Sequence, residues 1–229
     1  MSLSPLARLR VLTWQRQRSR RREFRFRFGR RQGFIRVRVR ARHSPFQAEF
    51  FLRSNASDLR TFQQIFLADF YNLAHFERWP ELIEACAQRA RRAPPLILDL
   101  GANIGLAAIY LAKLFPQARI LAVEPDRDNF ALLQRNLAPF PQVLPLLAAV
   151  ASADGAARIL DPDAPPDARR AGPAAVADAD AVPAYSIASL LAMAAPAEPW
   201  LAKADIEGAE AALFDPGDWV AQFPILILE

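Results

Sequence analysis

The sequence predicts an α/β fold in which a parallel sheet has helices on both faces. Three short apolar segments, 95–100, 120–124 and 200–204, each contain or meet an acidic residue near their end, and each is followed by a segment that favours a helix. Strands that alternate with helices favour parallel pairing, because parallel neighbours need a long crossover connection. The length of 229 residues and the hydrophobic content of 52% suffice for one such domain with modest additions.

The N-terminal part of the chain predicts a β-hairpin with one apolar face. Phenylalanines alternate with arginines in 24–28, aliphatic residues alternate with arginines in 35–40, and a turn that contains two glycines separates them. Residues 46–52 favour a further strand. We therefore expect residues 1–57 to form a basic N-terminal arm with a hairpin, and residues 58–229 to form the core.

The charge of the chain is distributed unevenly. Residues 1–42 hold 15 arginines and one acidic residue, whereas residues 43–229 hold 14 basic and 23 acidic residues. A basic arm attracts polyanions such as nucleic acid or anionic lipid without sequence selectivity. The arm has no recognised nucleic-acid fold signature, and the chain uses 27 arginines against two lysines. A solvated hairpin face is therefore the favoured interpretation, and a nucleic-acid partner is not expected.

A long amphipathic helix is expected over residues 58–79. The apolar side chains that recur there at helical spacing are Leu59, Phe62, Ile65, Phe66, Phe70, Leu73 and Phe76. Such a helix is expected to pack on the sheet or to cover its crevice, and plain core packing is the favoured interpretation. Another helix is expected over residues 80–90.

A glycine turn follows the first strand of the core. Gly101 and Gly105 lie in the run DLGANIG at 99–105, and a helix begins near Leu106. We expect glycine at 101 because the backbone must turn sharply and approach a ligand, and at 105 because helix and strand must pack closely. Backbone amides at the start of the helix then face the ligand. The G-x-x-x-G spacing differs from the G-x-G-x-x-G of dinucleotide-binding turns and favours an aminoacyl nucleoside.

Two further acidic residues are expected beside this turn. Glu124 ends the second strand, nineteen residues after Gly105, where a βαβ unit brings an acid to ribose hydroxyls. Asp205 follows the third strand. Because the carboxyl ends of parallel strands line one crevice, Asp99, Glu124 and Asp205 should converge there. Each motif alone also fits an ordinary strand and helix with a solvent-facing acid, but together the motifs favour a binding site.

Three motifs together resemble a known family. DLGANIG at 99–105, VEPD at 123–126 with Asn129-Phe130 after it, and KADIEGAE at 203–210 are similar to the motifs of the FkbM family of S-adenosylmethionine-dependent methyltransferases, in this order and at these separations. The resemblance covers about residues 58–229. It implies a Rossmann-like class I methyltransferase sheet with S-adenosyl-L-methionine as cofactor, and it leaves the acceptor open.

The resemblance also implies roles for individual residues. The first acid and the glycine turn are expected to hold the aminoacyl end of the cofactor, and the acid of the second strand is expected to hold its ribose. A loop after the strand expected over residues 142–147 is expected to hold its adenine. These residues are Asp99, Gly101, Ala102, Asn103, Gly105, Glu124, Pro125 and Ala149. Asp205 is the candidate for positioning or deprotonating an acceptor hydroxyl. Glu207 either assists Asp205 or only favours the N-terminus of the next helix.

The rest of the core follows the same alternation of strand and helix. Helices are expected over 106–115 and 127–137, the second capped by Asp126, and a strand over 142–147. Residues 161–184 are rich in alanine, proline and aspartate without any apolar period. That composition favours a loop or a flexible, disordered insertion.

The C-terminal residues 223–229 form a continuous apolar run, typical of a central parallel strand that is buried on both faces. Related folds continue after such a strand with a helix and an antiparallel strand pair. We therefore expect C-terminal strands to be missing from this chain. On this interpretation the chain is a fragment, or a partner covers the open edge, as in an edge-strand homodimer.

Several kinds of site and location are disfavoured. Cys86 is the single cysteine and can form no internal disulfide, and His43 and His75 are far apart in sequence, so no metal site is expected. No apolar run reaches the roughly eighteen residues of a membrane span, and no signal peptide is recognisable. A cytoplasmic location is the resulting expectation.

The expected function is methyl transfer from S-adenosylmethionine to an oxygen nucleophile, with a hydroxyl of a sugar or other natural product as acceptor. Two alternatives stay open. A nicotinamide-dependent oxidoreductase shares the strand, turn and ribose acid but has a tighter glycine spacing. A non-catalytic binding protein with a degenerate methyltransferase core, in which the basic hairpin carries the function, fits a sheet that lacks strands.

Overall fold

The structure is a computed structural model, and it describes residues 24–42, 44–68, 70–206, 213–214 and 218–228. The chain forms two compact units, Met1–Phe70 and Tyr71–Glu229. Helical residues that follow the N-terminal strands thus belong with those strands. The expected division into domains 1–57 and 58–229 stays a prediction.

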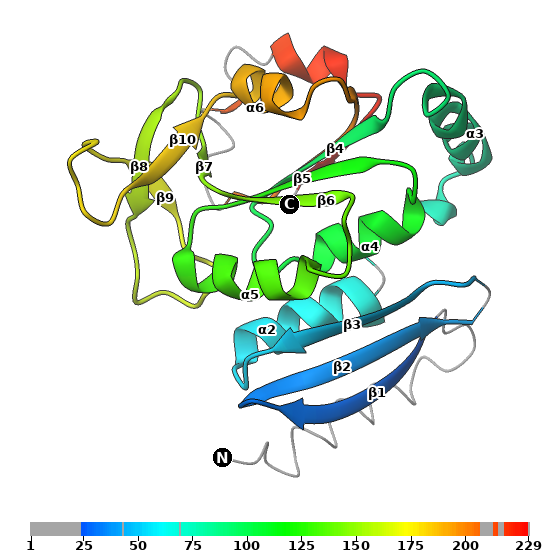
Figure 1. The fold of residues 1–229 in the computed structure, drawn as a ribbon, viewed down its shortest axis with the longest axis horizontal. Helices are drawn as coiled ribbons and strands as arrows, with labels where there is room; N and C mark the ends of the chain where they lie inside the picture. Colours follow the sequence, from blue (N-terminus) through cyan, green and yellow to red (C-terminus); the bar gives the residue numbers. More distant parts are fainter. Residues whose placement is uncertain (1–23, 43, 69, 207–212, 215–217, 229) are drawn as a thin grey trace. The chain divides into compact units, whose positions relative to one another are not determined.

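The first unit contains a three-stranded antiparallel sheet in the order β1-β2-β3 (Figure 1). Its strands are β1 (Phe24–Arg31), β2 (Phe34–Ala41) and β3 (Gln47–Leu52). Gln32 and Gly33 connect the first two with φ values of 52° and 81°, the left-handed conformation that a two-residue hairpin turn requires. The predicted hairpin and the further strand are confirmed.

One face of this sheet packs on a short helical segment. The segment consists of α2 (Ala56–Phe62) and the π-helical turn η1 (Gln63–Leu67). The rings of Phe26 and Phe62 lie 5.4 Å apart, a distance typical of packed aromatic pairs. The alternate positions of β1 and β2 carry exposed arginines, namely Arg25, Arg27, Arg38 and Arg40.

The prediction of one continuous helix over residues 58–79 is wrong. Helical structure ends with η1 and resumes in η2 (Leu73–His75) and α3 (Trp79–Arg89). Phe70 and Phe76 are 59% and 64% exposed, so they do not extend the buried face of α2. The apolar spacing therefore predicted a helix that is too long, because the pattern includes these two exposed side chains, which are not buried in the core. The helix expected over residues 80–90 is confirmed by α3.

The second unit contains a five-stranded parallel sheet in the order β12-β11-β4-β5-β6. Its strands are β4 (Pro95–Leu100), β5 (Arg119–Glu124), β6 (Val143–Leu147), β11 (Glu198–Ala204) and β12 (Ile225–Leu228). Every residue of β4 is buried, as expected of a parallel strand that is covered on both faces. The predicted parallel sheet with its three motif strands is confirmed.

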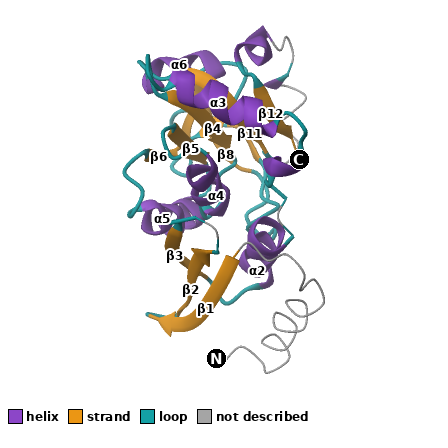
Figure 2. Cartoon of the chain, turned by 90° about the vertical axis from the view of Figure 1, so that its right-hand side faces the viewer, coloured by secondary structure: helices purple, strands orange, loops and turns teal. Residues whose placement is uncertain are grey.

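Helices lie on both faces of the parallel sheet. Two of them, α4 (Leu106–Leu114) and α5 (Arg127–Leu137), lie against one face, and α6 (Ile187–Ala194) lies against the other (Figures 1 and 2). Asp126 caps α5 as predicted, because its Oδ1 accepts the backbone N–H of Asn129 at 2.8 Å. Helices α4 and α5 thus begin beside the carboxyl ends of β4 and β5.

A smaller sheet adjoins the carboxyl end of β6. Its order is β7-β10-β8-β9, with β7 (Ala149–Val150), β8 (Gly155–Ile159), β9 (Ala171–Pro173) and β10 (Val182–Tyr185). The sequence predicts a loop or disordered insertion over 161–184, but β9 and most of β10 lie within it. Strands of three or four residues rich in alanine and proline are too short to show an alternating pattern, so the prediction missed them.

Strand β12 forms one edge of the parallel sheet among the described strands, and the short helical turn η3 (Asp218–Gln222) precedes it. Its first three residues are half-buried and Leu228 is 55% exposed. The described sheet therefore does not bury this strand on both faces as the sequence predicts, and the continuation of the fold by further strands stays a prediction. None of the helices in the described residues has the length and apolar character that would cross a bilayer.

Candidate functional site

Hydrogen bonds from two neighbouring elements hold the turn between β4 and α4. The backbone N–H groups of Gly101 and Ala102 both donate to the carbonyl oxygen of Val123 in β5, at 3.0 and 2.9 Å. From α5, Nδ2 of the fully buried Asn136 donates to the carbonyl oxygen of Ile104 at 2.8 Å. The turn is therefore fixed from both sides.

Both glycines of the turn are required by geometry. Gly101 has a φ of +74°, and a Cβ there would lie 1.8 Å from the carbonyl oxygen of Asp205. Gly105 has a φ of +85°, and a Cβ there would lie 3.2 Å from Cγ of Leu137 in α5. A Cβ at Gly101 would thus meet the backbone at the end of β11, and Gly101 also lines the pocket described below, so its approach to a ligand stays a prediction. At Gly105 the close contact is with the neighbouring helix α5, and not with a strand as expected.

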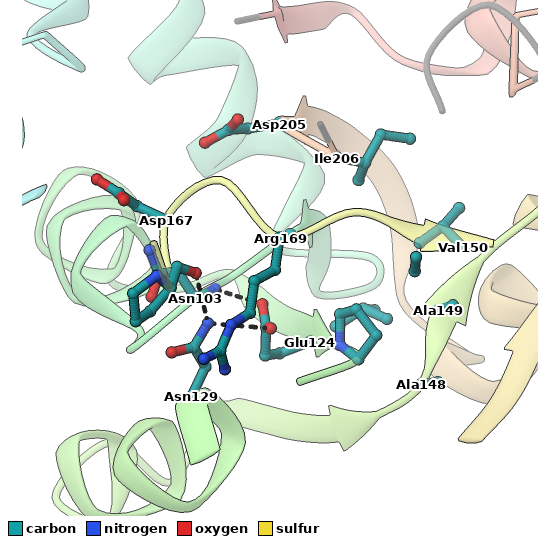
Figure 3. Close-up of a pocket in the computed structure, with 15 residues that line it drawn as sticks. Asn103, Glu124, Asn129, Ala148, Ala149, Val150, Asp167, Arg169, Asp205 and Ile206 are labelled. Atoms are coloured by element: carbon teal, nitrogen blue, oxygen red, sulfur yellow. Dashed lines mark hydrogen bonds between the residues drawn. The ribbon is translucent and has the colours of Figure 1, made fainter. Parts of the chain in front are cut away.

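A pocket opens beside this turn, at the carboxyl ends of β4, β5 and β11 (Figure 3). It holds about 580 Å³ of empty space, part of it open to solvent. Its lining includes Gly101, Asn103, Glu124, Asn129, Arg169 and Asp205 together with an apolar group described below.

Glu124 lies in the pocket with only 5% of its surface exposed. Its Oε2 accepts the backbone N–H of Asn103 at 2.8 Å, and its Oε1 accepts the backbone N–H of Asp126 at 3.0 Å. Burial raises the pKa of Glu124 to about 7, because loss of water disfavours the charged form more than these hydrogen bonds favour it. Near neutral pH this carboxyl group can therefore lose its proton and accept hydrogen bonds from a ligand hydroxyl.

A segment that the sequence did not mark as functional covers part of the pocket. We name residues 164–171 the strap. Arg169 Nη1 forms an ion pair with Asp126 Oδ2 at 2.6 Å, and Asn129 Nδ2 donates to the carbonyl oxygen of Pro166 at 2.9 Å. These two contacts attach the strap to the start of α5. The strap residues that line the pocket are Pro166, Asp167, Arg169 and Ala171.

The remainder of the pocket wall is largely apolar. It consists of Val123, Pro125, Ala148, Ala149, Val150 and Ile206. In Figure 3, Ala148, Ala149 and Val150 lie on one side of Glu124, and Asn103 and Asp167 lie on the other. Apolar walls with a few convergent polar groups are typical of sites for small organic ligands. The pocket thus has a polar end and an apolar end, with Glu124 between them.

Asn103 contributes a buried polar atom to the pocket. Its Oδ1 is buried and accepts no hydrogen bond within the described part of the chain. Buried polar atoms are normally satisfied, and an unsatisfied one costs about 1–3 kcal/mol. An amino or hydroxyl group of a ligand in the pocket would satisfy it.

An ion-pair cluster lies next to the turn. Lys203 Nζ in β11 donates to the carbonyl oxygen of Gly101 at 2.8 Å and lies 3.4 Å from Asp99 Oδ1 and 3.5 Å from Asp205 Oδ2. The side chains of Lys203 and Asp99 are 2% and 0% exposed, whereas that of Asp205 is 33% exposed. Of the three charged groups, only Asp205 lines the pocket.

The structure brings together most residues that the sequence predicts for the site. Those in the pocket lining are Gly101, Asn103, Glu124, Pro125, Ala149 and Asp205. Those outside the lining are Asp99, Ala102 and Gly105: the first pairs with Lys203, and the other two shape the turn. Glu207 lies outside the described residues. The binding and catalytic roles of all these residues stay predictions.

Three contributors to the site were not assigned a role from the sequence. Lys203 had a usable signal, because it is a charged residue inside the otherwise apolar stretch 200–204, two positions before Asp205. Asn129 was named with the VEPD motif at 123–126, but the sequence predicted no contact for its side chain. Arg169 had no signal, since the strap has neither helical nor strand periodicity. Within the described residues, no three side chains of His, Cys, Asp or Glu gather as they would around a metal ion.

Comparison with known proteins gives short matches to proteins with methyltransferase names. The chain is 52% identical over 44 residues to Methyltransferase sdnD of Sordaria araneosa, which covers 19% of this chain and 17% of that protein. It is 44% identical over 41 residues to Methyltransferase 1 of Beauveria bassiana, which covers 18% of this chain and 16% of that protein. The chain thus spans about a sixth of the length of these two curated relatives.

A third match is to the AMB antimetabolite synthetase AmbE of Pseudomonas aeruginosa, with 45% identity over 53 residues, 22% of this chain and 2% of that protein. The family model of the Methyltransferase FkbM domain matches residues 99–229. That range is more than half of the chain, and it contains the glycine turn, Glu124 and Asp205 on their three adjacent strands. The chain therefore belongs to the FkbM methyltransferase domain family.

Proposed function

We propose that this chain is an S-adenosylmethionine-dependent methyltransferase that acts on a hydroxyl group of a small molecule. The observation that carries the proposal is the pocket at the carboxyl ends of β4, β5 and β11, where a rigid glycine turn meets a buried acid and an apolar wall. In open parallel sheets, ligands bind outside the carboxyl ends of the strands. Membership of the FkbM family supports methyl transfer as the reaction.

The residues present fit an aminoacyl nucleoside in one orientation. The carboxylate of Glu124 suits the ribose hydroxyls, because a carboxylate accepts strong hydrogen bonds from hydroxyl groups. The wall at Ala149 suits the adenine ring. At the polar end, the unsatisfied Oδ1 of Asn103 suits the ammonium of the aminoacyl part. The Rossmann-like assignment of the sheet belongs to this same proposal.

When bound, S-adenosylmethionine supplies an electrophilic methyl group on a sulfonium sulfur, which keeps the electron pair of the broken carbon–sulfur bond. The chain's own task is to orient an acceptor oxygen in line with that methyl group and to receive the hydroxyl proton. We assign the proton to Asp205, because its carboxylate is partly exposed and lines the pocket near the glycine turn.

The acceptor belongs to the proposal as a chemical class only. We infer a hydroxyl of a sugar or other natural product. One matched protein carries the name of an antimetabolite synthetase, which favours small molecules over macromolecules as acceptors. A non-catalytic binding protein would use the same pocket without turnover, and a nicotinamide-dependent enzyme would use it for a dinucleotide.

Isothermal titration calorimetry separates these functions. At pH 8, the chain should bind S-adenosylhomocysteine with a dissociation constant in the micromolar range, about −8 kcal/mol, and NAD much more weakly. Glu124→Ala should weaken the binding of S-adenosylhomocysteine by about 1.5–3 kcal/mol, because the ribose hydroxyls lose a charged acceptor. The control is Glu84→Ala, since Glu84 is an exposed acid of α3 that is not among the residues lining the pocket. Preferential binding of NAD, or equal binding by the Glu124 variant, contradicts the proposal.

Enzymatic and non-catalytic versions of the proposal differ in turnover. Donor labelled in the methyl group should transfer the label to members of a panel of sugars and hydroxylated natural products, and Asp205→Asn should lower this transfer about 10²- to 10⁴-fold if Asp205 takes the proton. Binding without transfer to any acceptor favours the non-catalytic version.

A further inference from the structure

Asp99, Lys203 and Asp205 form a charged cluster, in which Lys203 has not yet been given a role. Lys203 and Asp99 are paired residues in the register of β11 and β4, so their side chains leave the sheet on the same face. Asp205 is two positions beyond Lys203. The single ammonium group thus lies within 3.5 Å of both carboxylates and also donates to the turn at Gly101.

The three charges do not cancel. Two carboxylates and one ammonium group leave one net negative charge. Asp99 is fully buried, and a buried charge is tolerated only beside a partner. Counted over these three described side chains alone, the net negative charge therefore lies at Asp205, which is the member that lines the pocket. Lys203 sets the size of that charge, because its removal would leave two negative groups in the same place.

We propose that Lys203 is a positioning residue that fixes one net negative charge at the pocket wall, and that this charge selects the cationic methyl donor over its neutral product. The inference rests on the proposed function. The donor and product differ by one charge, since the sulfonium sulfur is cationic and the thioether sulfur of S-adenosylhomocysteine is neutral. A fixed negative charge favours the cation by Coulomb attraction in a site of low dielectric constant.

The test is the ratio of two affinities, measured by calorimetry without any acceptor. The ratio compares S-adenosylmethionine with S-adenosylhomocysteine for each variant. Contacts with the adenosine and aminoacyl parts cancel in this ratio, because the two molecules share them. The ratio therefore reports only how the site responds to the sulfonium charge. If Lys203 had a purely structural role, its substitution would not change this ratio.

Asp205→Asn should lower the ratio about tenfold, since the cluster becomes neutral. Lys203→Arg should keep the wild-type ratio within about twofold, because the positive charge is conserved. Lys113→Met removes the other lysine of the chain, which lies over the ring of Tyr110 in α4 and outside the cluster. That control should also leave the ratio within about twofold.

The effect of removing Lys203 must be measured in a variant that still folds. Lys203→Met alone leaves Asp99 buried without an ammonium group beside it. We therefore compare Asp99→Asn with the double variant Lys203→Met/Asp99→Asn, which differ only in the ammonium group. The cluster is neutral in the first and carries one negative charge in the second. The ratio should rise about tenfold from the first to the second.

The outcomes separate this inference from the proposed function. If the wild-type chain binds neither nucleoside, the proposed function fails and this inference fails with it. If the wild type binds both and the ratio is the same in all variants, the pocket function stands and Lys203 has only a structural role. If the ratio follows the net charge of the cluster in the order stated, Lys203 determines selectivity for the donor.

Discussion

At Glu124, burial and hydrogen bonding act on one carboxyl group in opposite directions. Three donors, the backbone N–H groups of Asn103 and Asp126 and the side chain of Asn129, favour its charged form. Loss of water outweighs them and raises the pKa to about 7. A ligand with two adjacent hydroxyls would add donors and favour the charged form further. Binding of such a ligand should therefore be coupled to loss of a proton.

This coupling predicts a pH dependence of nucleoside binding. The affinity for S-adenosylhomocysteine should rise as the pH increases from 6 to 8 and level off above the pKa of about 7, because protonated Glu124 must lose its proton to accept from the ribose. Below that pKa the affinity should change by up to about tenfold per pH unit. Calorimetry across this range measures it. Glu124→Gln, which does not titrate, should bind weakly with a flat profile, and an equal slope in that variant assigns the pH dependence to another group.

Substitutions of three glycines in the second unit should differ in cost. Gly101→Ala should lower the free energy of unfolding by about 3 kcal/mol or more, because it combines a left-handed φ with a backbone clash at Asp205. Gly105→Ala should cost about 1–2 kcal/mol, since it has a similar φ but meets the movable side chain of Leu137. Gly155→Ala meets nothing within 4 Å, so it should be neutral or stabilise by up to about 1 kcal/mol. Urea denaturation followed by tryptophan fluorescence gives the three values, and any other order contradicts the close approach at Gly101.

Among the elements, the strap depends on two adjacent arginines to different extents. Arg169 pairs with Asp126 at side-chain exposures of 18% and 8%, whereas Arg170 pairs with Asp161 at 60% and 27%. Partly buried ion pairs with short hydrogen bonds contribute more than exposed ones, which often contribute almost nothing. Arg169 also lines the pocket. The strap should therefore be held mainly by the first arginine.

We expect Arg169→Gln to weaken binding of S-adenosylhomocysteine about fivefold, which corresponds to roughly 1 kcal/mol. Amide hydrogen exchange over residues 164–171 should become faster in the same variant. Arg170→Gln is the matched control, and it should change both quantities less than twofold. Equal effects of the two substitutions would mean that the ion pair with Asp126 does not fasten the strap.

The elements also differ in how far the sequence predicts them. The strand–turn–helix units around Gly101 and Glu124 were predictable because long apolar strands, glycines and a capping aspartate all favour the same local structure. The segment after α2 was mispredicted because Phe70 and Phe76 continue the helical spacing but remain exposed. Strands β9 and β10 were not predicted because they are defined by pairing with β8, a contact that the local pattern of these short segments does not show.

The same distinction holds within the site. Glu124 and Asp205 follow from the rule that acids at the carboxyl ends of parallel strands converge. The pairing of Asp99 with Lys203 depends on the register of β4 against β11, which lie about a hundred residues apart in sequence. No local pattern specifies that register. Arg169 likewise becomes part of the pocket only through a long-range contact with Asp126.

At the scale of the whole molecule, β12 is an open edge among the described strands of the parallel sheet. Edge strands with apolar side chains pair with other chains. We propose that the 229-residue chain associates through this edge at tens of micromolar. Leu228→Lys should lower the apparent mass in light scattering, whereas Met193→Lys, a charge introduced at a similarly exposed apolar residue of α6, should not. A monodisperse wild-type monomer would remove the edge-pairing proposal.

The central claim is that the pocket beside the glycine turn holds the nucleoside of the methyl donor. A crystal structure of the chain with S-adenosylhomocysteine at pH 8 tests it most directly. The account predicts ribose hydroxyl oxygens within about 2.6–3.2 Å of the Glu124 carboxylate, with the adenine against Ala149 and the aminoacyl end at Asn103. A nucleoside bound elsewhere, or bound in this pocket without contact to Glu124, would contradict the account.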